Sequence, residues 1–181
     1  MLMSRKKSIG IFGGSFDPPH KGHVKITKIC LKKMNFEKIY WVVTKQNPFK
    51  KKTTFSLNER MVKSRKAVKK IKKIKVLFLD RKVKSSRTIN IVNYLKKINK
   101  KKKLYLILGS DNLISFHKWT SWRKIVKLTK LVVFSRKGYG KKNEGSTVEN
   151  FLKKENIIYM NNKFINVSSS NIRRNYHKKY L

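Results

Sequence analysis

Short apolar runs alternate with amphipathic segments along the chain of 181 residues. The runs have the length and the β-branched or aromatic character of buried strands, and the segments between them have helical periodicity. Strands that alternate with helices in this way predict a mainly parallel sheet whose crossover helices lie on its two faces. We therefore expect a doubly wound α/β fold, formed by residues 1–181 as a single domain.

The same alternation gives each predicted element its place. We expect strands at residues 9–12, 39–44, 76–79, 104–108, 131–134 and 157–160, and helices at residues 24–34, 57–71, 88–98, 121–128 and 169–179. In sheets of this kind, ligands bind at the carboxyl ends of the strands. The segments that follow four of the strands are therefore expected to converge on one crevice: 13–15, 44–50, 109–111 and 135–136.

A few residues are expected to serve the fold rather than a ligand. Ser56 and Glu59 have the spacing of a capping box at the start of a predicted helix. Arg60 lies in the same helix, and we expect it to be structural or peripheral to the site. Cys30 is the only cysteine of the chain. It has no partner for an internal disulfide and no metal-site spacing around it, so we expect a small buried hydrophobe.

The chain carries no sequence signal for a membrane. The basic residues 1–7 lead directly into a predicted strand, without the apolar core of a signal peptide. No segment approaches the roughly 18 apolar residues of a membrane span. We expect a cytoplasmic protein without a membrane partner, and no apolar pattern indicates its oligomeric state.

The charge of the chain is strongly positive. Lys and Arg number 48, Asp and Glu only 8, and the net charge is +40. One interpretation is a nucleic-acid-binding module. However, the lysines are spread over polar helix faces and loops and do not alternate with aromatic residues, which favours ordinary solvated positions. We expect no specific nucleic-acid partner, but faster encounter with anionic substrates and salt-sensitive adhesion to nucleic acid.

The segment after the first predicted strand reads GGSFDPPHKGH, from Gly13 to His23. Glycines let the backbone approach an anion closely, and the N–H groups and dipole of a helix start favour negative charge. His20 and His23 are three residues apart and so share one face of a helix. Two histidines could simply cap an ordinary helix, but the strand, turn and helix in sequence predict a polyphosphate site.

This segment resembles the signature of the HxGH nucleotidyltransferases, and its particular form resembles that of the nicotinate-nucleotide adenylyltransferases. A second segment, VSSSNIR from Val167 to Arg173, is similar to the ISSTxIR motif of the same superfamily, with Ser170 in place of threonine. The resemblance runs from about Ser8 to about Tyr176 and implies a Rossmann-like fold. The implied reaction moves AMP from ATP to nicotinate mononucleotide, and gives nicotinate adenine dinucleotide and pyrophosphate for NAD biosynthesis.

The resemblance implies an ATP site at the two ends of the chain. His20 and His23 would be the catalytic pair and would donate hydrogen bonds to phosphate oxygens. The ATP-binding residues implied are Gly13, Gly14, Ser15, Phe16, His20, His23, Ser168, Ser169, Ser170 and Arg173. Mg²⁺ is expected as a cofactor that the ATP phosphates carry, since it keeps much of its hydration shell and the chain has few acidic residues. No protein metal ligand is expected.

The resemblance also implies a site for nicotinate mononucleotide. The segment from Leu108 to Trp122 is similar to a GxDxLxxFxxW region, in which Trp119 would stack on the pyridine ring and Asp111 would fix the nucleotide. An indole face suits an electron-poor pyridinium. The alternative is that both tryptophans pack a helix against the sheet, which we expect for Trp122. The mononucleotide-binding residues implied are Lys50, Ser86, Arg87, Thr88, Asp111, Trp119, Thr120 and Arg136.

Three of these positions depart from the family pattern or are ambiguous. Residues 86–90 are similar to a TYTIDT segment whose backbone amides bind the nicotinate carboxylate, with Arg87 in place of tyrosine and Asn90 in place of aspartate. Residues 136–139 are similar to RPGY, with Lys137 in place of proline, at the start of a loop expected to be mobile. The lysine that meets phosphate could be Lys50 or either of the two lysines after it.

Two related substrates remain open from the sequence. An enzyme for nicotinamide mononucleotide would differ from one for nicotinate mononucleotide only in the donors that meet the nicotinate carboxylate. Those donors are backbone amides, and a sequence does not show their geometry. Phosphopantetheine is the substrate of another adenylyltransferase with the same first and last motifs. That enzyme lacks the GxDxLxxFxxW region, which this chain contains.

Overall fold

The computed structural model describes residues 7–46, 53–135, 147–152, 156–160 and 169–179. Six strands form one sheet in the order β3-β2-β1-β4-β5-β6. The strands are β1 (Ser8–Gly14), β2 (Phe36–Val43), β3 (Ile74–Leu77), β4 (Lys103–Gly109), β5 (Thr129–Phe134) and β6 (Ile157–Met160). Every neighbouring pair is parallel, so the predicted doubly wound α/β fold is confirmed.

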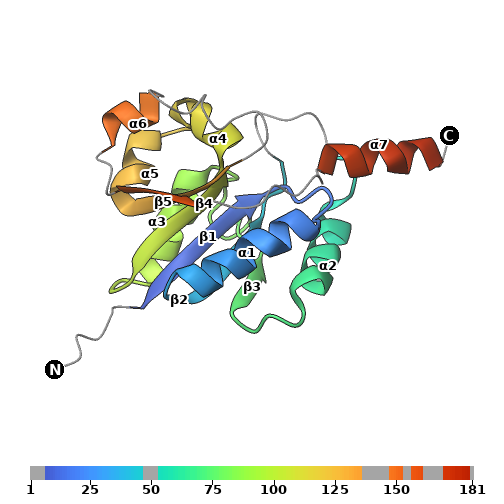
Figure 1. Cartoon of the computed structure of the whole chain (residues 1–181), viewed down its shortest axis with the longest axis horizontal. Helices are drawn as coiled ribbons and strands as arrows, with labels where there is room; N and C mark the ends of the chain where they lie inside the picture. Colours follow the sequence, from blue (N-terminus) through green and yellow to red (C-terminus); the bar gives the residue numbers. More distant parts are fainter. Residues whose placement is uncertain (1–6, 47–52, 136–146, 153–155, 161–168, 180–181) are drawn as a thin grey trace.

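The helices between the strands cover both faces of this sheet (Figure 1). They are α1 (Lys21–Lys33), α2 (Leu57–Val68), α3 (Thr88–Ile98), α4 (Ser110–Ile114), the 3₁₀ turn η1 (Phe116–Lys118), α5 (Trp122–Leu128) and α6 (Thr147–Phe151). Helix α7 (Ser169–Lys179) follows β6 and extends away from the sheet (Figure 1). The strand order reverses between β1 and β4, which is the switch point where ligands bind in open α/β sheets.

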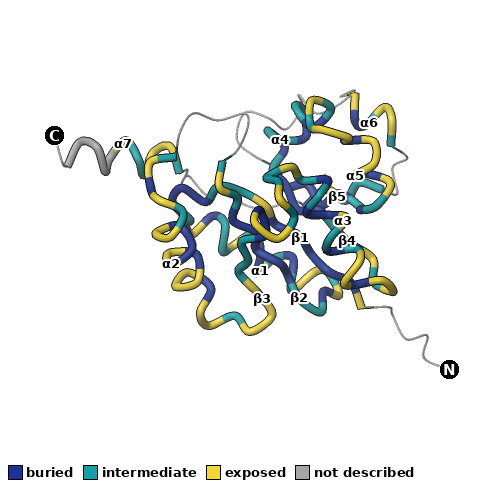
Figure 2. The backbone as a smooth tube through the Cα atoms, turned by 180° about the vertical axis from the view of Figure 1, so that it is seen from behind, coloured by how far each residue is buried: buried dark blue, intermediate teal, exposed yellow. Residues whose placement is uncertain are grey.

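Alternate residues of the strands pack into two separate hydrophobic cores, one on each face of the sheet. In β2, Tyr40 and Val42 pack on the side of α3 and α5, whereas Ile39, Trp41 and Val43 pack on the side of α1 and α2. This is the period of two that side chains follow along a strand. Figure 2 shows the buried sheet between exposed outer helix faces. Because both faces are covered, the strands are apolar almost throughout.

Most predicted structural roles are confirmed. Cys30 is fully buried, and burial raises the pKa of its thiol to about 12. The hydroxyl of Ser56 accepts from the N–H of Glu59 at 3.2 Å, and the Glu59 carboxylate accepts from the N–H of Ser56 at 2.8 Å, which completes the capping box. Trp122 is buried and packs edge-on against Phe151, as expected of a core residue.

Several predicted boundaries are wrong. Gly13 and Gly14 form the end of β1 rather than the turn, which begins at Ser15. The apolar run at 76–79 suggested a later strand, whereas β3 ends at Leu77 and Leu79 enters the core without pairing to a strand. The helix predicted for 57–71 ends at Val68, where a turn closes between Val68 and Ile71.

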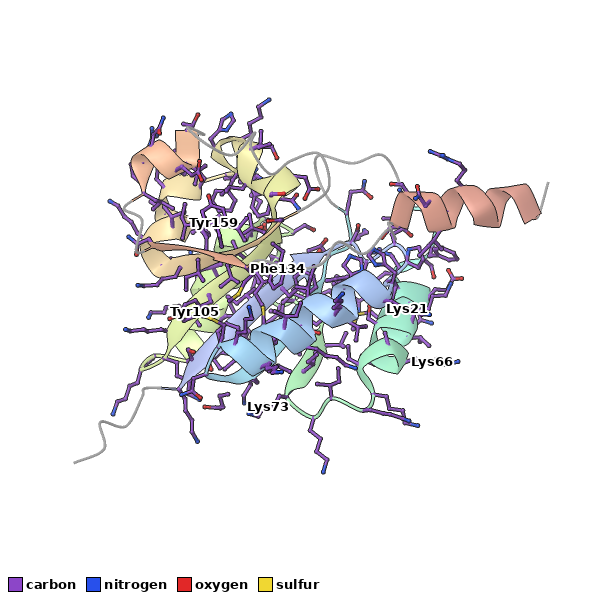
Figure 3. The ribbon with its side chains drawn as sticks, in the orientation of Figure 1. Lys21, Lys66, Lys73, Tyr105, Phe134 and Tyr159 are labelled. Carbon is purple, nitrogen blue, oxygen red and sulfur yellow. The ribbon has the colours of Figure 1, made fainter. Side chains whose placement is uncertain are left out.

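The prediction that lysines occupy solvated helix faces and loops is confirmed on α1, on α2 and in the turn before β3. Lys21, Lys25 and Lys28 are exposed on α1. Lys66 and Lys73 extend outward from α2 and from the turn before β3 (Figure 3). Among the described residues, no helix is long and apolar enough to cross a membrane.

Candidate active site

The two histidines at the start of α1 hold each other through the backbone. His20 is the N-cap, and its Nδ1 accepts from the N–H of Gly22 at 3.1 Å. Nδ1 of His23 accepts from the N–H of His20 at 3.2 Å, and the two rings stack with centroids 3.7 Å apart. A neutral imidazole that accepts at Nδ1 carries its proton on Nε2. Both rings are therefore hydrogen-bond donors at Nε2.

Two aromatic side chains pack against the ring of His23. Its ring meets Phe16 edge-on at 5.0 Å and lies 5.9 Å from Phe12, and Phe16 rests on the fully buried Trp41 at 4.4 Å. Phe16 has a φ of 46°, in the left-handed region that few non-glycine residues adopt. Its side chain is buried under His23, so its predicted contact with ATP would have to come from its backbone.

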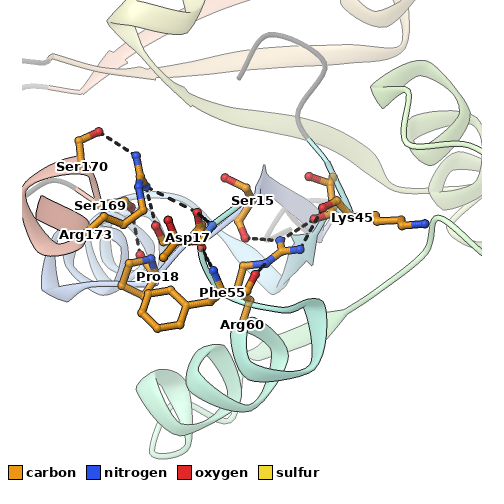
Figure 4. A network of polar contacts seen from close by, with 11 residues as sticks. Ser15, Asp17, Pro18, Lys45, Phe55, Arg60, Ser169, Ser170 and Arg173 are labelled. Atoms are coloured by element: carbon orange, nitrogen blue, oxygen red, sulfur yellow. Dashed lines mark hydrogen bonds and ion pairs between the residues drawn. The ribbon is translucent and has the colours of Figure 1, made fainter. Parts of the chain in front are cut away.

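The start of α7 lies against the turn between β1 and α1 (Figure 4). The Ser169 hydroxyl donates to the carbonyl of Pro18 at 3.0 Å. The Arg173 guanidinium donates to the carbonyl of Asp17 at 2.6 Å and to the Ser170 hydroxyl at 3.1 Å, and lies 3.8 Å from the Asp17 carboxylate. The structure thus brings together two predicted motifs that are about 150 residues apart in the sequence.

Asp17 and Arg60 fix the loops around this turn, and sequence reasoning missed their partners. The buried Asp17 carboxylate accepts from the N–H groups of Thr54 and Phe55, both at 2.9 Å. Arg60 is 1% exposed and donates to four backbone carbonyls. Burial lowers the pKa of its guanidinium, and the charges of Asp17 and Asp80 oppose that shift. The expected structural role of Arg60 is therefore confirmed.

A pocket of about 320 Å³ opens beside the segment before α3. Asp80 lies at its wall, and its carboxylate accepts from the N–H of Lys45 at 2.8 Å and from the Ser86 hydroxyl at 2.6 Å. The pocket is lined by Lys45, Leu57, Phe78, Asp80, Arg81, Ser85 and Ser86. Arg87 is the exposed N-cap of α3, and Thr88 is its first residue. Ser86 belongs to the same loop as Asp80, whereas Lys45 lies on the loop after β2, so the link that Asp80 makes between the two loops has no signal in the local sequence.

The segment after β4 places the other predicted residues. Asp111 lies in the first turn of α4, and its carboxylate folds back so far that a Cβ at Gly109 would come within 2.5 Å of it. Trp119 is the residue that follows η1 and caps its end. Its side chain is half-buried, and the centroid of its ring lies 4.8 Å from that of Phe116. Thr120 beside it is exposed. One side of the Trp119 ring is thus supported by the core, as a stacking platform requires.

Some predicted residues lie outside the described part of the chain. They are Lys50 with its neighbours Lys51 and Lys52, Arg136 with the loop 137–146, and Ser168. Within the described ranges, no three His, Cys, Asp or Glu side chains cluster as a metal site.

A parallel sheet with a donor-rich helix start at its switch point defines the class of doubly wound α/β proteins that bind phosphate-bearing ligands at this edge. Residues 11–175 match the family model described as cytidylyltransferase-like. The chain belongs to this family, and within it to the nicotinate-nucleotide adenylyltransferases.

Two relatives illustrate the assignment. A probable nicotinate-nucleotide adenylyltransferase of Pelagibacter ubique is 44% identical over 173 residues, which cover 96% of each chain. A protein of the same name from Nitratiruptor sp. is 41% identical over 132 residues, which cover 72% of this chain and 75% of that one.

Solved structures share the fold. The nicotinic acid mononucleotide adenylyltransferase of Plasmodium falciparum superposes with a TM-score of 0.73 in its complex with APC, at 17% identity. In its complex with NaAD the TM-score is 0.70, at 20% identity. Each alignment covers 93% of this chain and 83% of the other.

Proposed function

We propose that this protein transfers the AMP moiety of ATP to nicotinate mononucleotide, and so forms nicotinate adenine dinucleotide and pyrophosphate in NAD biosynthesis. The observation that carries the proposal is that Ser169 and Arg173 bond to Pro18 and Asp17, in the turn that leads into the paired histidines at the switch point of the sheet. The names of the relatives and the ligands APC and NaAD of the similar structures support the same reaction.

The chemistry needs no protein nucleophile. The phosphate of the mononucleotide attacks the α-phosphorus of ATP, a new P–O bond forms, and the bond to the pyrophosphate leaving group breaks. Catalysis then consists of in-line positioning and of stabilising the transferring and leaving oxygens. His20 and His23 donate through Nε2 to phosphate oxygens, and Arg173 supplies positive charge.

Fixed donors complete the proposed ATP half. The backbone of Gly13, Gly14 and Ser15 approaches the phosphates at the end of β1, and the start of α7 offers the Ser170 hydroxyl, while the Ser169 hydroxyl holds this helix start on the carbonyl of Pro18. Backbone amides are donors, whereas Mg²⁺ binds oxygen acceptors, with carboxylates the usual side-chain ligands. These donors therefore suit an ATP molecule that brings Mg²⁺ on its own phosphates, and we propose this complex as the substrate. We further propose a cytoplasmic location, where both nucleotides are available.

We assign the mononucleotide half to the segment before α3 and to the segment after β4. The Ser86 hydroxyl donates to Asp80, and the backbone N–H of Arg87 donates to the Ser85 hydroxyl at 3.1 Å. In the segment of Ser86, Arg87 and Thr88, the backbone amides of Ser86 and Thr88 are therefore the donors that we assign to the nicotinate carboxylate. Trp119 provides the stacking face beside the end of β4. The remaining proposed ligands of the mononucleotide are Asp111, Thr120, Lys50 and Arg136.

Pyrophosphate release by the purified protein tests this function. The assay contains ATP and Mg²⁺ with nicotinate mononucleotide, nicotinamide mononucleotide or phosphopantetheine as the acceptor. Turnover dominated by the nicotinate substrate is the expected result. Turnover dominated by another acceptor would keep the ATP site and overturn the second pocket. If no acceptor led to pyrophosphate release, and the protein retarded DNA in a gel-shift assay at physiological salt, a nucleic-acid-binding module would be favoured.

A further inference from the structure

Arg60 occupies a position that an uncharged side chain could fill at lower cost. It lies in the first turn of α2 and is 1% exposed. Removing a charge from water costs several kcal/mol even after relaxation, and well-packed apolar residues often replace buried charges without loss of stability. The arginine is therefore better explained by what its guanidinium holds than by the stability it adds.

The guanidinium joins the loop after β1 to both ends of the loop between β2 and α2, at the carboxyl edge of the sheet (Figure 4). Nη1 donates to the carbonyls of Ser15 after β1 and of Thr44 after β2, each at 2.7 Å. Nη2 donates to the carbonyl of Lys45 at 2.9 Å, and Nε donates to that of Phe55 at 3.1 Å. A planar group with fixed donor directions sets the separation of these carbonyls more tightly than flexible contacts could.

Further hydrogen bonds connect the segments that the Arg60 guanidinium holds to each half of the proposed site. On the ATP side, the N–H of Phe55 donates to the Asp17 carboxylate, and the carbonyl of Asp17 accepts from Arg173. On the mononucleotide side, the N–H of Lys45 donates to Asp80, which also accepts from Ser86. The guanidinium thus stands between the polyphosphate turn and the pocket beside α3.

We propose that Arg60 is a positioning residue that sets the distance and the angle between the two substrate halves of the site. The proposal rests on the proposed adenylyl transfer, in which the attacking phosphate must lie in line with the leaving pyrophosphate. Arg60 touches neither substrate. It acts through Ser15 on the ATP side and through Lys45 on the side of the mononucleotide.

The kinetic test compares Arg60→Lys and Arg60→Met with Arg65→Met, which removes an exposed arginine of the same helix. Each variant is first shown to be folded at the assay temperature by circular dichroism. We expect kcat to fall at least about tenfold in both Arg60 variants, because misplacement of reacting groups is costly. The dissociation constants of ATP and of nicotinate mononucleotide, each measured alone, should stay within about threefold. Unchanged kcat in the folded variants would overturn the proposal.

Amide hydrogen exchange provides a readout that does not depend on turnover. Loss of the guanidinium should accelerate exchange at Lys45, Thr54 and Phe55, and leave Leu106 and Val132 in the sheet unchanged. Uniform acceleration would mean that Arg60 only stabilises the fold, and no acceleration would mean that it does not hold the loops. Either result would overturn the proposal. If the wild-type protein released no pyrophosphate at all, the proposed function would fail, and the exchange comparison would still decide whether Arg60 holds the loops.

Discussion

The backbone decides which nitrogen of His20 and of His23 carries the proton. Nδ1 of His20 and Nδ1 of His23 both accept from N–H groups at the start of α1, so Nε2 is the donor in each ring. Stacking on His20 and contact with Phe16 then restrict the orientation of the His23 ring. The donors are therefore preorganised before ATP binds, which is the condition under which electrostatic stabilisation is most effective.

Replacement of His23 tests this arrangement. We expect His23→Ala to lower turnover at least a hundredfold, in line with the loss of a preorganised donor to a developing charge. The circular dichroism spectrum should change little, because the ring is only partly buried. Pyrophosphate release measures the effect, with Lys25→Ala on the exposed face of α1 as the control. A near-normal rate in the folded variant would reject the assigned role.

Trp119 is the residue whose replacement separates the two substrates. We expect Trp119→Ala to raise the KM for nicotinate mononucleotide more than the KM for ATP, because the indole would stack on the pyridinium. Trp119→Phe keeps an aromatic face and should recover part of the loss. Steady-state kinetics with each substrate varied in turn provide the comparison. Equal changes in the two KM values would contradict stacking.

At the scale of the elements, the helix α2, which contains Arg60, begins with a capping box. The Ser56 hydroxyl and backbone N–H both bond to Glu59, and these bonds lower the pKa of the Glu59 carboxyl. A carboxyl whose pKa is lower in the folded protein stabilises the fold above its ordinary value of 4.5 and loses that effect as the pH falls through this range.

The cap therefore predicts a pH-dependent stability difference. Glu59→Gln keeps the hydrogen-bonding geometry of a capping box but cannot ionise. We expect the wild-type protein to melt at a higher temperature than the variant near pH 7, and the difference to shrink as the pH falls below 4.5. Thermal unfolding at several pH values measures it. A difference that does not depend on pH would show that the charge contributes nothing to the cap.

The elements with strong local signals are the ones that the sequence predicted best. The helices at Thr88–Ile98 and Ser169–Lys179 begin and end at the predicted residues. Helices α4 and α6 were missed, because five residues are too few to show helical periodicity. The histidine pair was predictable from a contiguous motif. The bracing by Arg60 and Asp80 was not, because their partners are loop backbone groups or residues on other segments.

At the scale of the whole molecule, the net charge of +40 is set against substrates that are all anions. Such a field raises the rate of encounter and is screened over about 10 Å at 0.1 M salt. Because lysines such as Lys21 and Lys66 are exposed rather than paired in the core, their effect should be kinetic and sensitive to salt.

This charge predicts how the rate depends on salt. Between about 50 and about 500 mM KCl we expect kcat/KM for ATP to fall several-fold, while kcat at saturation changes much less, because screening slows encounter rather than the bond-making step. Stopped-flow or initial-rate measurements over this range separate the two constants. A flat kcat/KM would show that the lysines do not steer substrate.

The contact between α7 and the turn after β1 has a consequence for the order of folding. Ser169 bonds to Pro18 and Arg173 to Asp17 across 151 and 156 residues of chain, whereas β1 and β2 are consecutive strands that pair along their length. Contacts between distant segments carry the larger loop-closure cost and form late. We therefore expect the two halves of the polyphosphate site to meet only after the central strands of the sheet have paired.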